Sequence, residues 1–122
     1  MKLTSPNAIA ERIDDHVIQL TFIRKNIVLR AEEVMCGWSL ALQIDPKRQS
    51  KILLLTAEGS LLDEEARAAA FEEKEKWLKI AMVVQNLGQT IMAKVSISKH
   101  TPSQNTQVFE CIEAARNWLF KD

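Results

Sequence analysis

The side chains that could do chemistry are few, and their spacing does not favour catalysis. The two histidines, His16 and His100, lie far apart, and no carboxylate has metal-ligand spacing to either. Ser60 lacks the GxSxG pattern of a nucleophile elbow, and no general base can be identified for it. Gly59 and Gly88 belong to no GxGxxG or Walker-type loop. We therefore expect no catalytic residue, no metal and no cofactor, and we interpret the protein as not an enzyme.

The two cysteines, Cys36 and Cys111, lie in segments with helical periodicity and have no CxxC spacing. This pattern predicts neither a disulfide framework nor a structural zinc site. We expect both to be buried, reduced thiols.

Composition excludes two classes of partner. The chain has 122 residues, and its 16 basic residues balance 16 acidic ones. A binder of nucleic acid needs clustered Lys and Arg, so we expect none. The longest apolar runs, such as Ile52–Leu55, fall far short of the roughly 20 residues that span a bilayer, and Met1–Arg12 lacks the apolar core of a signal peptide. We expect one cytoplasmic domain over residues 1–122, without membrane insertion.

The first third of the chain changes from strand to helix periodicity. Ala8–Ile13 and His16–Phe22 are β-prone runs separated by Asp14-Asp15, which predicts a hairpin. The second run has Ile18, Leu20 and Phe22 on one face.

A helix should begin at about Leu29. It should end near Ile44, because Pro46 disfavours the helical backbone conformation at the residue before it. The inward stripe of this helix includes Val34, Trp38 and Ala41.

The middle of the chain alternates between strand and helix. Lys51–Leu55 lacks alternation, as expected of a central strand covered on both faces. After the Gly59-Ser60 turn, a helix should start near Asp63 and reach about Trp77. Ile80–Val84 is a second continuous apolar strand.

The last third is predicted as helix, strand and helix. Leu87, Ile91 and Val95 have helical spacing, Thr106–Phe109 is a short edge-like strand, and Cys111–Phe120 is a terminal helix. The predicted order is a hairpin followed by α-β-α-β-α-β-α. We expect an α/β fold with a mixed four- to five-stranded sheet, an N-terminal β-hairpin and about four helices.

Three stretches, Lys51–Arg67, Ile80–Val84 and Phe109–Leu119, carry a family resemblance through the order and length of their elements. With them the pattern from His16 to Leu119 resembles the STAS family of anti-sigma-factor antagonists, and in particular its divergent bacterial members described as SpoIIAA-like. The resemblance implies a SpoIIAA-like fold and a non-enzymatic regulatory or protein-interaction module, with another regulatory protein as a partner.

The phosphorylation motif of that family is missing. The anti-sigma-factor antagonists of the family that this chain resembles have the sequence Asp-Ser-Ser/Thr-Gly at the start of the helix after the central strand. A kinase phosphorylates a serine in this motif. Here the stretch reads Asp63-Glu64-Glu65-Ala66, with neither a hydroxyl nor a glycine. Ser60, Asp63, Glu64 and Glu65 are thus a candidate degenerate switch region. The alternative is structural: Asp63 caps a helix and the glutamates occupy its first turn.

A charged run, Glu72-Glu73-Lys74-Glu75-Lys76, should form a solvated helical face, with a docking surface as the alternative.

Four large apolar residues are ambiguous between core, pocket and interface: Met35, Trp38, Trp77 and Met92. The lipid-binding relatives of this fold make a small hydrophobic or lipid-like ligand, held between sheet and helices, the alternative function. If these four residues instead belong to the core or to an interface, they are consistent with a protein-interaction module. We expect a homodimer that uses an edge strand (the hairpin or Thr106–Phe109) or the surface of the first helix around Trp38.

Overall fold

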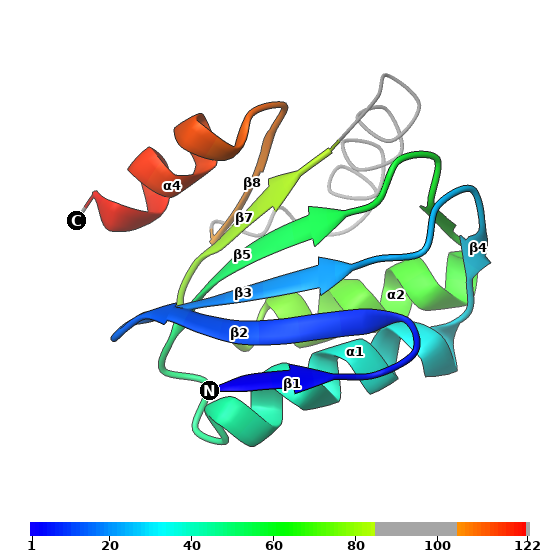
Figure 1. Cartoon of the computed structure of the whole chain (residues 1–122), viewed down its shortest axis with the longest axis horizontal. Coiled ribbons are helices and arrows are strands. Elements are labelled where there is room, and N and C mark those ends of the chain that lie inside the picture. The colour runs from blue at the N-terminus through cyan, green and yellow to red at the C-terminus, as the bar shows by residue number, and fades with distance from the viewer. Residues whose placement is uncertain (85–104, 122) are drawn as a thin grey trace.

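The computed structural model describes residues 1–84 and 105–121, and its centre is a six-stranded sheet (Figure 1). The strand order is β1-β2-β3-β5-β7-β8. The bounds of these strands are Lys2–Thr4 for β1, Ala8–Asp14 for β2, Val17–Phe22 for β3, Lys51–Thr56 for β5, Ile80–Val83 for β7 and Thr106–Phe109 for β8. Strands β1 to β3 are antiparallel, whereas β3, β5, β7 and β8 are parallel neighbours. The mixed sheet is confirmed, with more strands than predicted.

The predicted hairpin is present, but it does not form an edge of the sheet. Strands β2 and β3 pair in antiparallel register, and the Asp14 carboxylate accepts a hydrogen bond from the His16 N–H in the turn. Strand β1 covers the other side of β2, pairing Leu3 with Ala10. Because β1 has only 3 residues, its sequence carries no periodicity that could have predicted it.

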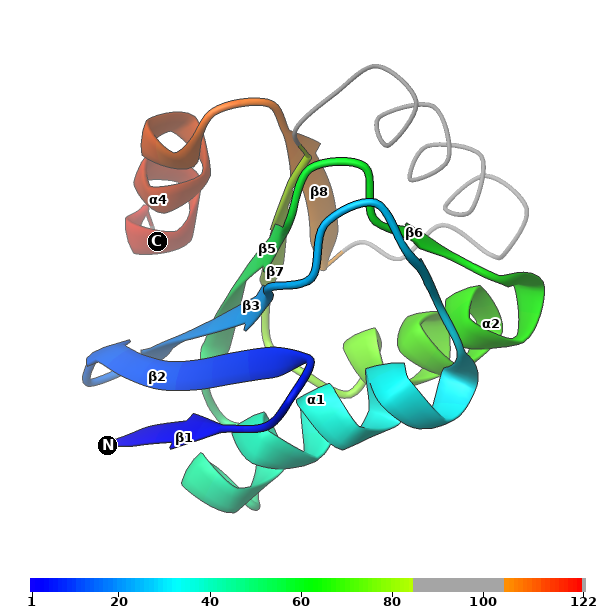
Figure 2. The same cartoon turned by 45° about the vertical axis from the view of Figure 1, so that its right-hand side comes forward.

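Within residues 1–84 and 105–121, two helices cover one face of the sheet and a third covers the other (Figure 2). Helix α1 (Ala31–Ile44) and helix α2 (Glu64–Lys74) connect successive parallel strands. Because each connection moves one strand further in the same direction, right-handed crossovers place both helices on the same side. Helix α4 (Ile112–Phe120) lies on the opposite side. The helical spacing predicted at Leu87, Ile91 and Val95 lies outside the described residues.

The sheet separates two hydrophobic cores. The larger core lies under α1 and α2 and contains Ile18, Leu20 and Phe22 of β3, as their alternation predicted. The smaller core lies under α4 and contains Val17 of the same strand and Leu119 of the helix. The period of two in β3 therefore separates the two sides of the molecule.

Gly37 allows α1 to approach the sheet closely. A Cβ atom at this position would lie 2.5 Å from Cε1 of Phe22 and 3.2 Å from Cβ of Ala8. Both neighbours are buried in the larger core, so a side chain here would force them to move.

Two lysines, one in β5 and one directly before β7, hold the end of α4, which has no basic residue in its own last turn. Lys51 Nζ donates to the Leu119 carbonyl at 2.7 Å, and Lys79 Nζ donates to the Trp118 carbonyl at 3.1 Å. The Lys79 ammonium also lies 4.3 Å from the centroid of the Trp118 ring. These contacts supply the positive charge that the carbonyl end of a helix favours.

The prediction that both cysteines are buried is wrong. Cys36 lies on the exposed side of α1, because the buried stripe passes through Val34, Gly37 and Trp38. Cys111 is the exposed N-cap residue of α4. Helical periodicity placed both thiols in the correct elements, but the preference of cysteine for the interior assigned their exposure incorrectly.

Candidate functional site

The candidate switch region lies between the central strand and α2. Gly59, with φ of 74°, and Ser60 follow β5 in a turn, and the side chain of Ser60 is only 2% exposed. The chain then forms the two-residue strand β6 (Leu61–Leu62) and reaches Asp63, the N-cap of α2. The sequence placed this helix start correctly. The predicted end at Trp77 is too late, since α2 ends at Lys74 and the chain turns before the tryptophan.

Asp63 makes a capping interaction. Its Oδ1 atom accepts a hydrogen bond from the Ala66 N–H at 2.7 Å, which satisfies one of the free amides of the first turn. Glu64 and Glu65 occupy that turn and are exposed, where the positive end of the helix dipole favours carboxylates. The capping interpretation of these residues is therefore correct, and it leaves the two glutamates available to a partner.

A second helix begins beside the first. Strand β4 (Val28–Leu29) pairs in parallel with β6, which aligns the chain entering α1 with the chain entering α2. In α1 the Glu33 carboxylate accepts a hydrogen bond from the N–H of Arg30, the N-cap residue. A shallow open cleft separates the two helix starts, and its lining is mostly acidic: Arg30, Ala31, Glu32, Asp63, Glu64 and Glu65.

Apolar side chains lie exposed next to this cleft. Val28 and Leu61 are register partners in β4 and β6, and they are 60% and 38% exposed. We call Val28 and Leu61, together with the six cleft residues, the helix-start surface. It can bind through apolar contact and charge, and it contains no imidazole, thiol or exposed hydroxyl for a reaction.

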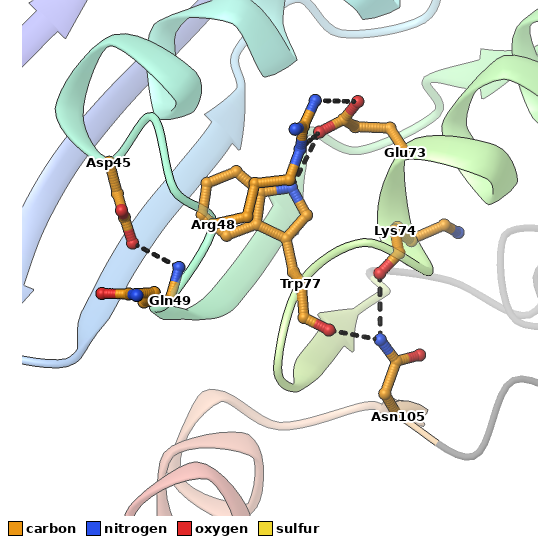
Figure 3. A network of polar contacts seen from close by, with 7 residues as sticks. All are labelled: Asp45, Arg48, Gln49, Glu73, Lys74, Trp77 and Asn105. Atoms are coloured by element: carbon orange, nitrogen blue, oxygen red, sulfur yellow. Dashed lines mark hydrogen bonds and ion pairs between the residues drawn. The ribbon is translucent and has the colours of Figure 1, made fainter.

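The other end of α2 holds a polar network that the sequence did not predict (Figure 3). The guanidinium of Arg48 donates to both carboxylate oxygens of Glu73, at 2.8 and 3.2 Å, and the Trp77 indole N–H donates to the same carboxylate at 2.9 Å. The Asn105 side-chain amide donates to the carbonyls of Lys74 and Trp77. The network joins α2 to the loop after α1 and to the start of β8.

The predicted solvated face over Glu72–Lys76 is therefore wrong in its centre. Glu73 is 3% exposed and Lys74 is 6% exposed, whereas Glu72, Glu75 and Lys76 face solvent. Glu73 can be buried because Arg48 and Trp77 neutralise and hydrogen-bond its carboxylate. The run of alternating charges hid this pairing, since its partners come from outside the run.

Lys74 has no such compensation. Its Nζ atom donates to the thioether sulfur of Met82 at 3.3 Å, and the ion pair found in the described part of the chain joins Arg48 to Glu73. Burial lowers the pKa of Lys74 to about 8, because the charged amine loses its water.

The structure places the four ambiguous apolar residues as follows. Trp38 and Trp77 belong to the larger core at 0% and 3% exposure, with ring centroids 6.2 Å apart. Met35 is half-buried on α1, and Met92 lies outside the described residues. A ligand pocket at this point would require the two indole rings to separate.

His16 is exposed at the start of β3, and His100 lies outside the described residues. Within residues 1–84 and 105–121, no cluster of three or more His, Cys, Asp or Glu side chains is arranged to hold a metal ion. Of the helices in the same ranges, none has the length and apolar character needed to cross a membrane.

Comparisons with known proteins are informative at the level of structure. No family model matches the chain, and no curated protein matches it. Among solved structures the chain is similar to the crystal structure of an uncharacterized protein from the DUF3478 family, with a SpoIIAA-like fold, from Shewanella loihica PV-4. The TM-score is 0.59 at 17% identity, over 92% of this chain and 91% of that chain. The chain therefore has the SpoIIAA-like fold that its sequence pattern suggested.

Replacing the α2 cap tests the role of Asp63. Asp63→Ala should lower the free energy of unfolding by about 1 kcal/mol, because the Ala66 N–H loses its acceptor. Asp63→Asn should retain most of the stability, since the amide oxygen can accept the same bond. Urea denaturation measures both, with the exposed Glu72→Ala as the control for a surface change on the same helix. Equal stability of the Ala and Asn variants would contradict the capping role.

Replacing Lys74 tests the burial of its charge. With a pKa lowered from 10.5 to about 8, the folded protein binds fewer protons than the unfolded chain between these pH values. Wild-type stability should therefore rise as the pH increases through this window. Lys74→Met should be more stable at pH 7, by up to about 3 kcal/mol, and should lose the rise. Denaturation from pH 7 to 10.5 measures this, and the exposed Lys76→Met should behave as wild type. A rise that persists in Lys74→Met would contradict the assignment.

Proposed function

We propose that the protein is a non-enzymatic, STAS-like regulatory or protein-interaction module, and that the helix-start surface binds its partner. The observation that carries this proposal is the chemistry of the segment from Asp63 to Ala66, which lies where the resemblance implies the switch. Asp63 is bound to the amide of Ala66, and Glu64 and Glu65 present fixed charges where the resemblance implies a phosphorylatable serine. The segment contains no hydroxyl, and Ser60 before it is buried. A partner would therefore meet a permanent negative charge and not a removable phosphate.

The chemistry of the surface supports binding. Exposed Val28 and Leu61 supply adjacent apolar contacts, and Glu32, Glu64 and Glu65 supply carboxylates around them. An apolar centre with a charged rim is the usual composition of a protein interface. The partner that complements it is a protein with an apolar contact patch bordered by Lys or Arg.

Site-specific photo-cross-linking in the native host tests this function. A photoreactive amino acid at Leu61 should give a covalent adduct with a partner protein, because this residue lies exposed between the two helix starts. The same probe at Glu113, in the first turn of α4 across the sheet, should give no such adduct. Mass analysis of the adducts identifies the partner.

Charge reversal supplies the matched control. Adding Glu64→Lys and Glu65→Lys should abolish the adduct formed from position 61, while Glu113→Lys, which makes the same first-turn change in α4, should preserve it. Circular dichroism checks that each variant is folded. The proposal fails when the Leu61 probe captures no partner, or when reversal of Glu64 and Glu65 leaves capture unchanged.

We also propose that the protein forms a homodimer through β8. In the described part of the chain β8 is the last strand of the sheet, and its register pairs Val108 with Met82 on the β7 side. Edge strands offer backbone groups to a second strand. The Trp38 side chain is 0% exposed and cannot itself contribute to the alternative interface on the surface of the first helix.

Light scattering tests the dimer. At micromolar concentration the protein should show twice the chain mass of 13.9 kDa. The carbonyls of Asn105 and Phe109 accept bonds from β7, so the alternation of a parallel strand turns the Val108 N–H away from β7. Val108→Pro should therefore reduce the mass to that of a monomer while the sheet stays intact. The monomer mass for wild type would contradict the dimer, and a dimer that survives Val108→Pro would exclude β8.

A further inference from the structure

The contact between Lys74 and Met82 joins the last turn of α2 to β7. Lys74 is 6% exposed, and its Nζ atom lies 3.3 Å from Sδ of Met82. Met82 is half-buried on the side of β7 that faces the larger core. The ammonium therefore points at the sulfur of a half-buried residue.

The acceptor is unusually weak for a buried cation. A thioether sulfur accepts hydrogen bonds poorly, whereas a buried ammonium is normally matched to a carboxylate or carbonyl oxygen. The adjacent carboxylate of Glu73 is occupied by Arg48 and Trp77. Among the described residues of other elements, Met82 of β7 and Asn105, the residue before β8, form hydrogen bonds with Lys74, and neither is charged. Within the described residues, Lys74 thus has a donor group without an oxygen acceptor from a side chain.

We propose that Met82 is an oxidation site whose sulfoxide oxygen accepts a hydrogen bond from the Lys74 ammonium. The oxidant is hydrogen peroxide or an organic hydroperoxide. A lone pair of the sulfur attacks one peroxide oxygen, so that an S–O bond forms and the O–O bond breaks. The sulfur loses two electrons and the peroxide gains them. With hydrogen peroxide, the proton left on the transferred oxygen moves to the departing hydroxide, and the second product is water.

The expected effect on stability is opposite to that of ordinary methionine oxidation. Sulfoxide formation in a core usually destabilises a protein, because a polar oxygen is buried without a donor. Here the new oxygen would lie beside a cation that lacks an oxygen acceptor. A charge-assisted hydrogen bond is roughly twice as strong as a neutral one, so it should offset the burial of the S=O group.

A peroxide titration tests the proposal, with mass mapping of each methionine. Met82 should be converted to sulfoxide in the folded protein, and Met1, which is 74% exposed, reports complete exposure to the oxidant. The thermal midpoint of the oxidised wild type should be unchanged or higher by about 2–5 °C. The rise in stability between pH 8 and 10.5 should also become shallower, because the charged amine gains an acceptor.

Two variants isolate the pair. Met82→Leu conserves the side-chain volume and removes the sulfur. The difference between its change in thermal midpoint with peroxide and that of the wild type therefore measures the effect of oxidising Met82. In Lys74→Leu, which removes the ammonium without adding a second sulfur, oxidation of Met82 should lower the midpoint, because the new oxygen meets no ammonium. A Met82 that stays reduced while Met1 is fully oxidised would overturn the proposal. The proposal would also be overturned if oxidation lowered the thermal midpoint of the wild type, relative to Met82→Leu, by as much as it lowers that of Lys74→Leu.

Discussion

Parallel pairing of β3, β5 and β7 is the constraint from which the rest of the structure follows. Parallel neighbours cannot be joined by a tight turn, so each pair requires a crossover helix, and the right-handed rule puts α1 and α2 on one face. In-register pairing of Leu20 with Leu54, and of Leu54 with Met82, then aligns the carboxyl ends of the strands. Both helices must begin at that edge. The short β4–β6 pair fixes the spacing between their starts, which is why the helix-start surface exists.

Charged side chains are exposed at the start of α2 and buried at its end. At its start, Glu64 and Glu65 are exposed to water and favoured by the helix dipole, so they need no partner from the protein. At its end, Glu73 and Lys74 are buried, and among the described residues only Glu73 has a counter-charge, from Arg48. The first arrangement suits recognition because its charges are accessible. The second joins separate segments and leaves one amine in a poorly compensated position.

Sequence periodicity predicted the strands and helices that are long enough to show a period. The alternation through Ile18, Leu20 and Phe22 predicted that these residues share one face of β3, and Asp63 marked the start of α2. Two-residue strands such as β4 and β6 show no period, so the pairing that brings the helix starts together was not predictable. Burial of Glu73 depends on Arg48, which is 25 positions away in the chain. Such a contact follows from the packing and leaves no local pattern.

The anchoring of α4 has a consequence for how this part of the protein can vary between relatives. Lys51 and Lys79 hold main-chain carbonyls, which every amino acid provides, and not particular side chains. The helix can therefore accept many substitutions on its exposed side, provided that Ala115 and Leu119 still fill the smaller core. Selection should act on the two lysines more strongly than on most of the helix that they hold.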